Sequence, residues 1–204
     1  MDKALRKFNS DLVEKNKVKN LTAHKSEEES WINNIQDSLL FLDAFPNKAK
    51  VLDLGSGCGC PAIPLKIALP NLDMTMIDSV NKKILFLNEA VRDIEGIRAI
   101  HTRIEDFKEY GKFDIVTARA VAPLPTLLEY AMPFLKVGGR LFAFKGSKWQ
   151  DEIDASKNAL KVLGGEVKEI KKHGETRTLI IIKKIKPTDK KYPRGKNLAR
   201  VQPL

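Results

Sequence analysis

An apolar run leads directly into a glycine-rich loop at Val51-Leu52-Asp53-Leu54-Gly55-Ser56-Gly57-Cys58-Gly59-Cys60. A short unbroken apolar run is typical of a strand that is buried on both faces of a sheet. Glycines allow the chain to turn tightly and let the backbone approach a ligand closely. Because ligands bind beyond the carboxyl ends of the strands in open parallel sheets, this pattern predicts a nucleotide-binding loop.

Strand-like and helix-like segments alternate on the C-terminal side of this loop. Such an alternation predicts a Rossmann-like α/β fold, in which a mostly parallel sheet carries helices on both faces. The last two strand-like segments follow each other without a helix between them, so we expect an antiparallel edge. We expect about seven strands, at residues 51–54, 74–77, 97–102, 113–117, 140–144, 166–172 and 177–185, and helices near 65–69, 81–94, 124–135 and 150–162.

Two helices are expected on the N-terminal side of the loop. Apolar residues recur at helical spacing within residues 2–19. Ser26, with Glu29 three residues later, has the spacing of a capping box that begins a second helix, which ends before Pro46. We therefore divide the chain into an N-terminal helical extension (1–46), a ligand-binding domain (47–185) and a basic C-terminal tail (186–204).

Positive charge is concentrated at the two ends of the chain. Residues 1–25 hold seven Lys or Arg and three acidic residues, a net of +4, and residues 183–204 hold eight Lys or Arg and one acidic residue, a net of +7. Subtracting both from the formal net charge of +10 leaves −1 for residues 26–182. This segregation favours a polyanionic partner such as nucleic acid, because neutralised phosphates release condensed counterions. A solvated tail without a partner is the alternative.

Composition restricts the class of protein. The chain has 204 residues, of which 43% are hydrophobic and 30% charged, which is typical of a globular domain. No apolar run approaches the roughly 20 residues that span a bilayer, and the charged N-terminus lacks the apolar stretch of a signal peptide. Cys58 and Cys60 are the only cysteines, and the histidines lie far from them in sequence. We therefore expect a cytoplasmic protein with no disulfide, no metal site and no membrane association.

The spacing of the glycines distinguishes between two classes of nucleotide. The dinucleotide fingerprint G-x-G-x-x-G requires a third glycine at the position of Cys60. The chain instead reads D-x-G-x-G-x-G from Asp53, which resembles the first motif of class I methyltransferases that use S-adenosylmethionine (SAM). Asp78 ends the second expected strand, where a carboxylate can accept hydrogen bonds from both ribose hydroxyls. A helix cap is the alternative role for this residue.

Two later segments also follow strands and supply candidate site residues. Ile104 and Glu105 follow the third strand, where an acceptor and an apolar group can contact adenine, although a plain loop fits this spacing as well. Arg119 follows the fourth strand, a usual position of catalytic or substrate-binding residues. The segment after it lacks the Asn/Asp-Pro-Pro-aromatic motif of amine methylation and the Pro-Cys motif of cytosine carbon-5 methylation. The sequence therefore predicts an acceptor atom that needs no activating residue.

These residues belong to a resemblance that covers nearly the whole chain. The chain resembles the bacterial small-subunit ribosomal RNA methyltransferase G family, first called glucose-inhibited division protein B (GidB). The resemblance rests on Asn20-Leu21-Thr22, Asp37-Ser38-Leu39, Asp53-Leu54-Gly55-Ser56-Gly57, Pro61, Ile63-Pro64-Leu65, Asp78-Ser79, Lys82-Lys83, Phe86-Leu87, Arg119-Ala120, Lys145-Gly146, Lys191-Tyr192-Pro193-Arg194 and Pro203-Leu204.

The resemblance implies methyl transfer from SAM to N7 of one guanine, guanine(527), in 16S ribosomal RNA or the small ribosomal subunit. It also implies where SAM binds. The family usually has Phe or Leu at the position of Cys60, so we expect thinner packing against the cofactor here. It also usually has Gly at the position of Ala62 and His at the position of Asn34. The cofactor-binding residues expected in this chain are Gly55, Gly57, Cys60, Asp78, Ile104, Glu105 and Arg119.

The chemistry implied by this resemblance needs orientation rather than a general base. Guanine N7 carries an in-plane lone pair and no proton at neutral pH, so it can attack the methyl group directly once held in line. Arg119 is expected to position the cofactor carboxylate or the target base. We expect a monomer whose basic residues bind RNA backbone. These residues are Lys145, Lys191, Arg194, Lys196 and Arg200. Neutralising those in the C-terminal tail should leave SAM affinity nearly unchanged.

Two other functions stay open on the sequence. An RNA-binding protein could keep the SAM fold without using it for methyl transfer. An NAD-dependent oxidoreductase would share the strand and glycine loop, although Cys60 occupies the position of its third glycine.

Overall fold

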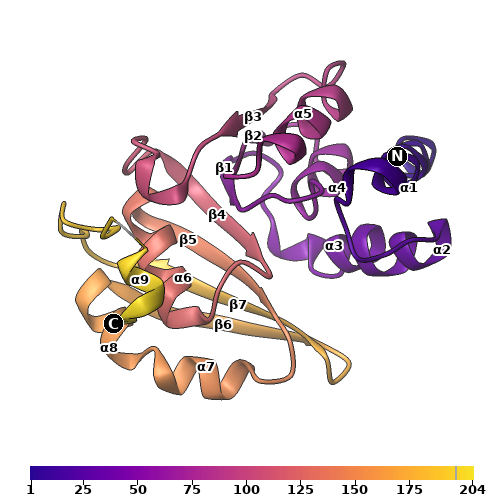
Figure 1. Cartoon of the computed structure of the whole chain (residues 1–204). Coiled ribbons are helices and arrows are strands. Elements are labelled where there is room, and N and C mark those ends of the chain that lie inside the picture. Colours follow the sequence, from indigo (N-terminus) through magenta and orange to yellow (C-terminus); the bar gives the residue numbers. More distant parts are fainter. Residues whose placement is uncertain (196) are drawn as a thin grey trace.

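The strand-like runs form one seven-stranded sheet in a computed structural model of the chain, which describes residues 1–195 and 197–204. The strand order is β3-β2-β1-β4-β5-β7-β6 (Figure 1). The first five of these strands are parallel, and β7 runs antiparallel to both of its neighbours, so the predicted antiparallel edge is confirmed. The strands are β1 (Lys50–Leu54), β2 (Asp73–Asp78), β3 (Ile97–His101), β4 (Phe113–Arg119), β5 (Leu135–Lys145), β6 (Gly165–His173) and β7 (Arg177–Lys184).

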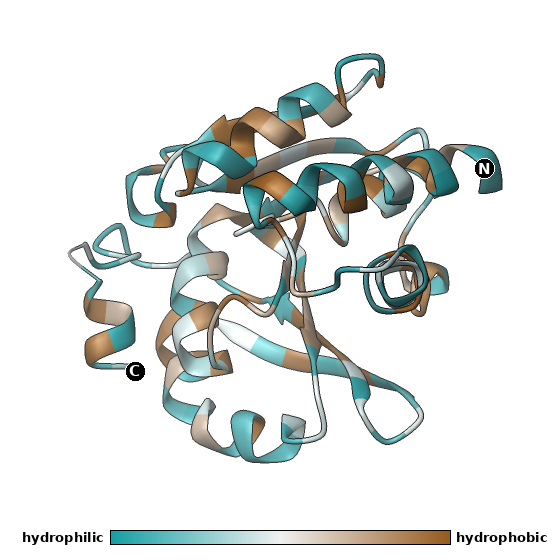
Figure 2. Ribbon diagram, turned by 45° about the vertical axis from the view of Figure 1, so that its right-hand side comes forward, coloured by the Kyte–Doolittle hydropathy of each residue, from teal (hydrophilic) through white to brown (hydrophobic). Residues whose placement is uncertain are grey.

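Helices cover both faces of the sheet because the strands bury side chains on both sides. In β1, Val51 packs in the core on one face and Leu52 in the core on the other. The first face carries α1 (Asp2–Lys19), α4 (Ala62–Ala68) and α5 (Asn81–Ala90). The second face carries α6 (Leu124–Ala131), α7 (Trp149–Ala155) and α8 (Lys157–Leu163) (Figure 1). Hydrophobic and hydrophilic residues alternate along these helices in Figure 2, as expected of helices that place one side on a sheet.

Three predicted helices end differently from the expectation. Helix α5 ends at Ala90, four residues before the expected position. The helix expected to reach residue 135 ends at Ala131 and continues as a short 3-10 turn around Pro133, whose ring cannot continue an α-helix. The helix expected over 150–162 is two helices that meet at Ser156, whose hydroxyl donates to the carbonyl of Glu152.

The predicted second helix of the N-terminal extension is interrupted by a wide turn. It begins as α2 (Glu27–Ser30) with the expected capping box of Ser26 and Glu29. It widens into a π-helical segment, Trp31–Gln36, and continues as α3 (Asp37–Leu39), which the 3-10 turn Leu42–Ala44 follows. Here the N–H of Asp37 donates to the carbonyls of Ile32 and Asn34 rather than to that of Asn33, its acceptor in a regular α-helix. The Asn33 carbonyl therefore does not accept from Asp37, its donor in a regular α-helix.

The C-terminal segment, residues 186–204, packs against α6 instead of extending into solvent. It contains a short helix that the sequence did not predict, α9 (Leu198–Val201), beside α6 (Figure 1). Tyr192 and Ala199 are buried in the core on the second face. The three-part division of the chain into domains stays a prediction, and both end segments contact the sheet domain in this structure. Among the described residues, no helix is both long and apolar enough to cross a membrane.

Candidate cofactor site

The glycine loop between β1 and α4 approaches its neighbours too closely for larger residues. Gly55 has a φ of +61°, and a Cβ there would lie 3.1 Å from a methyl carbon of Val121. Gly59 has a φ of +90°, and a Cβ there would lie 2.6 Å from the side chain of Ile63. The left-handed backbone and the close contacts both require glycine. The loop therefore follows the carboxyl end of β1 tightly, which is where a ligand of this fold is expected.

Two cavities open at the carboxyl ends of the parallel strands. The larger has a volume of about 980 Å³ and the smaller about 240 Å³. Gly55 and Val121 line both, so the glycine loop lies between the two cavities. The larger cavity contains Gly57, Cys60, Arg119 and Lys145 in its wall, and the smaller contains Asp78, Ile104, Glu105 and Arg200.

Asp78 connects the end of β2 to the glycine loop. Its carboxylate accepts a hydrogen bond from the N–H of Gly57 at 2.9 Å and one from the N–H of Val80 at 2.8 Å. Val80 precedes α5, so Asp78 forms a turn before the helix and is not its cap. The side chain is only 6% exposed but faces the smaller cavity. A carboxylate held by two backbone donors keeps free lone pairs for hydroxyl donors of a ligand.

Glu105 lines the smaller cavity and has a buried carboxylate oxygen. Its side chain is 8% exposed, and among the described residues its buried Oε1 has no hydrogen-bond partner. The guanidinium of Arg103 lies 3.6 Å from this oxygen, a distance that allows an ion pair but is too long for a hydrogen bond. Ile104 lines the same cavity and packs against the core of the second face. Because a buried acceptor is costly when it stays unpaired, this oxygen is suited to accept from a ligand.

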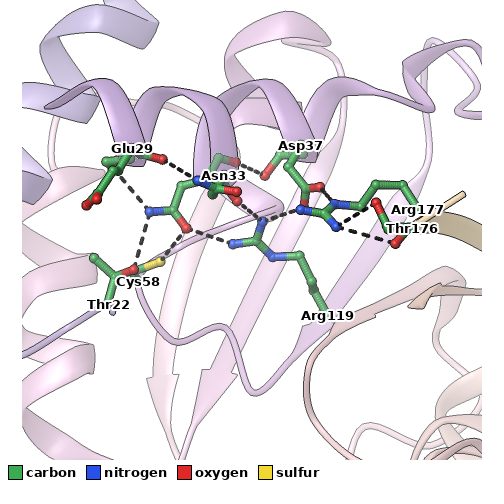
Figure 3. Close-up of polar contacts among 11 residues, drawn as sticks. Thr22, Glu29, Asn33, Asp37, Cys58, Arg119, Thr176 and Arg177 are labelled. Carbon is green, nitrogen blue, oxygen red and sulfur yellow. Dashed lines mark hydrogen bonds and ion pairs between the residues drawn. The ribbon is translucent and has the colours of Figure 1, made fainter. Parts of the chain in front are cut away.

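Arg119 points from the end of β4 into the N-terminal extension (Figure 3). Its Nη1 donates to the carbonyl of Asn33 at 3.0 Å and to Asp37 Oδ2 at 2.9 Å. Its Nη2 donates to Asn34 Oδ1 at 3.1 Å. The widened helical turn thus supplies an acceptor for this arginine. Burial would lower its pKa, but neighbouring groups, including Asp37, raise it overall, so the guanidinium stays charged.

Asp37 joins Arg119 to a second arginine that the sequence did not single out. Arg177, at the start of β7, donates to the other carboxylate oxygen of Asp37 (Figure 3). All three residues line the larger cavity. The ion pairs span 82 and 140 residues of sequence, so no local pattern indicates them. The only signal in the sequence that could have pointed to this acidic partner is the Asp37-Ser38-Leu39 motif.

Buried ionisable groups surround the glycine loop. Burial raises the pKa of Asp53 to about 6, and among the described residues its Oδ2 has no hydrogen-bond partner, while Oδ1 accepts from Thr117 at 2.7 Å. A hydrogen bond from Cys60 lowers the pKa of Cys58 to about 7, and burial raises that of Cys60. Both thiols are free and buried, and both line the larger cavity.

Two of the cations that we expected to contact RNA phosphates instead pair with groups of the protein itself. Lys145 donates to the carbonyl of Ala122 at 2.8 Å and to Glu152 at 2.6 Å, with its side chain only 9% exposed. Arg194 forms a two-pronged pair with Glu129, which is fully buried. These contacts stabilise the fold, and sequence charge could not distinguish such cations from free ones.

The remaining cations expected at RNA occupy different positions. Lys191 is exposed and lies 3.7 Å from Asp189. Arg200 lines the smaller cavity beside the glycine loop. Lys196 lies outside the described residues. The cavity walls also contain residues that the sequence did not predict as site residues: Asn33, Asn34 and Asp37 from the N-terminal extension, Lys148 just before α7, Arg177 at the start of β7, and Tyr130 from α6. In the part of the chain that the structure describes, no group of three or more His, Cys, Asp or Glu side chains is arranged to hold a metal ion.

Comparisons with known proteins agree with this geometry. The family described as rRNA small subunit methyltransferase G (GidB) matches residues 1–181. Ribosomal RNA small subunit methyltransferase G from Lactobacillus johnsonii is 41% identical over 95% of this chain and 87% of the relative, and that from Streptococcus pyogenes serotype M12 is 42% identical with the same coverage.

Solved structures share the fold. TYW2 of M. jannaschii in complex with AdoMet, which is SAM, is 17% identical with a TM-score of 0.63, covering 74% of this chain and 76% of that one. The ribosomal protein L11 methylase of Lactobacillus delbrueckii is 19% identical with a TM-score of 0.60, covering 76% and 80%.

Proposed function

The chain belongs to the rRNA small subunit methyltransferase G family of SAM-dependent methyltransferases, and from this we propose that it methylates N7 of a guanine in 16S ribosomal RNA. The protein would act as a monomer in the cytoplasm, where its RNA substrate is assembled. The observation that carries this proposal is the position of the glycine loop between two cavities. One cavity has the size and polarity for a nucleoside, and the other leaves room for a second reactant.

The residues of the smaller cavity fit the nucleoside end of SAM. Asp78 offers a carboxylate suited to ribose hydroxyls, and the Oε1 of Glu105, which has no hydrogen-bond partner among the described residues, is suited to the exocyclic amine of adenine. Gly55 and Gly57 would lie along the ligand, where a Cβ at Gly55 would meet Val121. Cys60 and Arg119 line the larger cavity and would contact the methionine end.

The protein's contribution is orientation. SAM supplies an electrophilic methyl group when bound. Guanine N7 has no proton to lose, so no side chain has to remove one. Arg119 is held by Asn33, Asn34 and Asp37, which fixes the plane of its guanidinium in the wall of the larger cavity. A planar fork of this kind can position a carboxylate or the Hoogsteen edge of guanine.

RNA would approach along the carboxyl edge of the sheet. Three cations lie at this edge: Lys148 after β5 and Arg177 at the start of β7, which line the larger cavity, and Lys172 near the end of β6. Lys172 lies 4.3 Å from the ring of Trp149, which adds an aromatic surface to this edge. Cations and an aromatic ring beside a deep cavity are suited to bind the backbone near an unstacked base.

Methylation of ribosomal RNA that lacks the modification tests this proposal. The purified chain is incubated with SAM carrying an isotopically labelled methyl group and with 16S RNA from cells without this gene. We expect label in 7-methylguanosine after digestion and mass spectrometry. Label in another nucleoside would contradict the N7 assignment. SAM binding without methyl transfer would favour an RNA-binding protein with an inactive fold.

Cofactor choice is tested separately from the chemistry. Calorimetry with SAM and with NAD should show binding of SAM alone, because Cys60 replaces the third glycine of the dinucleotide motif. Binding of NAD in preference to SAM would favour an oxidoreductase.

A further inference from the structure

The C-terminal segment is fixed to α6 by a buried ion pair. Glu129 on α6 is fully buried, and Arg194 donates to both of its carboxylate oxygens, at 2.9 and 2.6 Å. The backbone N–H of Arg194 donates to the same carboxylate at 2.8 Å, and its Nη2 donates to the carbonyl of Gln202 at 2.7 Å. A charge this deeply buried needs its partner, so the pair holds the segment in one position.

This attachment places Arg200 at the wall of the smaller cavity. Thr126 of α6 donates to the carbonyl of Ala199 at 2.9 Å, which fixes α9 beside α6. Arg200 then donates to the carbonyl of Val121 at 3.0 Å, next to the glycine loop, and lines the same cavity as the buried Tyr130. Arg200 and Tyr130 line the cavity that also contains Asp78 and Glu105.

The polar groups of this cavity complement an adenine base. Adenine carries one exocyclic amine, which donates, and ring nitrogens, which accept. The buried Oε1 of Glu105, which has no hydrogen-bond partner among the described residues, can accept, and the guanidinium of Arg200, which has five donors, can donate or lie against the ring. Neither group alone would distinguish adenine from other bases.

We propose that Arg200 is a SAM-binding residue that recognises the adenine base together with Glu105, and that the Glu129–Arg194 pair positions it. This inference rests on the proposed SAM-dependent function. It changes the role expected of Arg200 from RNA-backbone contact to cofactor binding. The C-terminal segment lies beyond residues 1–181, which the family description matches, so that description assigns nothing to it.

Calorimetry with two ligands tests this assignment. The probes are SAM and 5′-methylthioadenosine, which has the nucleoside but lacks the amino-acid end. Arg200→Ala should weaken binding of both ligands by about tenfold. Arg200→Lys should recover only part of this loss, because an ammonium lacks the planar fork. Lys191→Ala, an exposed cation of the same segment, is the matched control and should stay within about twofold of wild type. Arg119→Ala should weaken SAM but not methylthioadenosine.

The positioning role of the ion pair has its own test. If Arg194 acts through Arg200, the two losses of affinity should not add. The double variant Arg194→Ala/Arg200→Ala should then bind methylthioadenosine with the same affinity as whichever single variant binds it less tightly. Thermal unfolding identifies any variant that fails to fold, and the Arg200 variants should fold normally because this side chain is exposed.

Wild-type affinity of Arg200→Ala for methylthioadenosine, alongside a weakened Asp78→Ala, would overturn the inference. Additive losses in the double variant would overturn the positioning role. Failure of the wild-type chain to bind SAM at all would instead overturn the proposed function.

Discussion

Asp78 both holds the glycine loop and lines the proposed nucleoside site, so one substitution affects both roles. Its carboxylate fixes the N–H of Gly57 and faces the nucleoside cavity. Asp78→Ala removes hydrogen bonds that involve a charged group, each worth about 1.5–3 kcal/mol, so SAM affinity should fall by about tenfold or more. Calorimetry measures this loss. Asp73→Ala, at the exposed opposite end of the same strand, is the control and should bind SAM normally. Normal binding by Asp78→Ala would exclude the ribose assignment.

Cys58 gives the mechanism a sensitive test near neutral pH. Its pKa is lowered to about 7 by Cys60, so a thiolate mechanism would give a rate that rises through that pH. We expect a nearly flat single-turnover rate from about pH 6 to 8.5, because guanine N7 needs no base and the guanidinium of Arg119 stays protonated. Cys58→Ser should keep most activity and follow the same profile, whereas Arg119→Ala should lower the rate at every pH. A rate that rises steeply with pH in the wild type but not in Cys58→Ser would show that the thiolate takes part.

Asp53 couples stability to pH through its burial. Its pKa is raised to about 6, so the folded chain binds this proton more tightly than the unfolded chain, whose pKa is near 3.8. The free energy of unfolding therefore falls as pH rises from 3.8 to about 6, by on the order of 2–3 kcal/mol, and stays lower above that. The difference in unfolding free energy between Asp53→Asn and the wild type should therefore favour the variant more at about pH 7.5 than at about pH 4.5. Chemical denaturation at both pH values measures the difference. Asp73→Asn should show no such change, and a pH-independent difference for Asp53→Asn would contradict the assignment.

At the scale of elements, the widened turn in the N-terminal extension orients Arg119. Asp37→Ala removes the shared partner of Arg119 and Arg177 and leaves both partly buried charges uncompensated. We expect a decrease of about 3 kcal/mol in unfolding free energy and weaker binding of SAM, with methylthioadenosine unaffected. Asp43, in the same extension, forms an exposed ion pair with Lys171 of β6, and Asp43→Ala should change the unfolding free energy little. Equal effects of the two substitutions would mean that Asp37 has no special role.

Elements with their own hydrophobic pattern can be predicted from the sequence, and those held by distant partners cannot. All seven strands are predictable in number and order, because each alternates or concentrates apolar residues over part of its length. The bounds are less predictable: β5 begins at Leu135, five residues before the expected start at residue 140. The widened turn before Asp37 depends on Arg119, and α9 depends on Arg194 and the buried Glu129, so neither has a local signal. Arg194 and Lys145 also pair with residues that no local pattern indicates, so the sequence does not distinguish them from unpaired surface cations. The glycine loop and Asp78 are predictable as site residues because their spacing follows from the sheet itself.

At the scale of the whole molecule, the distribution of free cations predicts where RNA binds. Lys148→Ala/Lys172→Ala removes two exposed charges from the carboxyl edge of the sheet, beside the larger cavity. The slope of log affinity against log salt should become shallower by about 0.7 for each phosphate that the protein no longer neutralises. Filter binding of 16S RNA at several salt concentrations measures the slope. Lys112→Ala/Lys161→Ala removes the same charge near the opposite edge and should leave the slope unchanged. An equal effect of both pairs would mean that RNA binding follows net charge alone.

The two cavities have walls from both ends of the chain, with Asn33, Asn34 and Asp37 at one end and Arg200 at the other. A ribosome adds roughly 5–20 residues per second, and the early part of a chain can fold before the rest has left the exit tunnel. The glycine loop and its strand would then exist for several seconds in a nascent chain whose nucleoside wall still lacks Arg200. Arrested or prematurely terminated chains that end before Arg200 would therefore fold much of the sheet and yet hold SAM poorly. Such fragments would compete little for the cell's methyl donor.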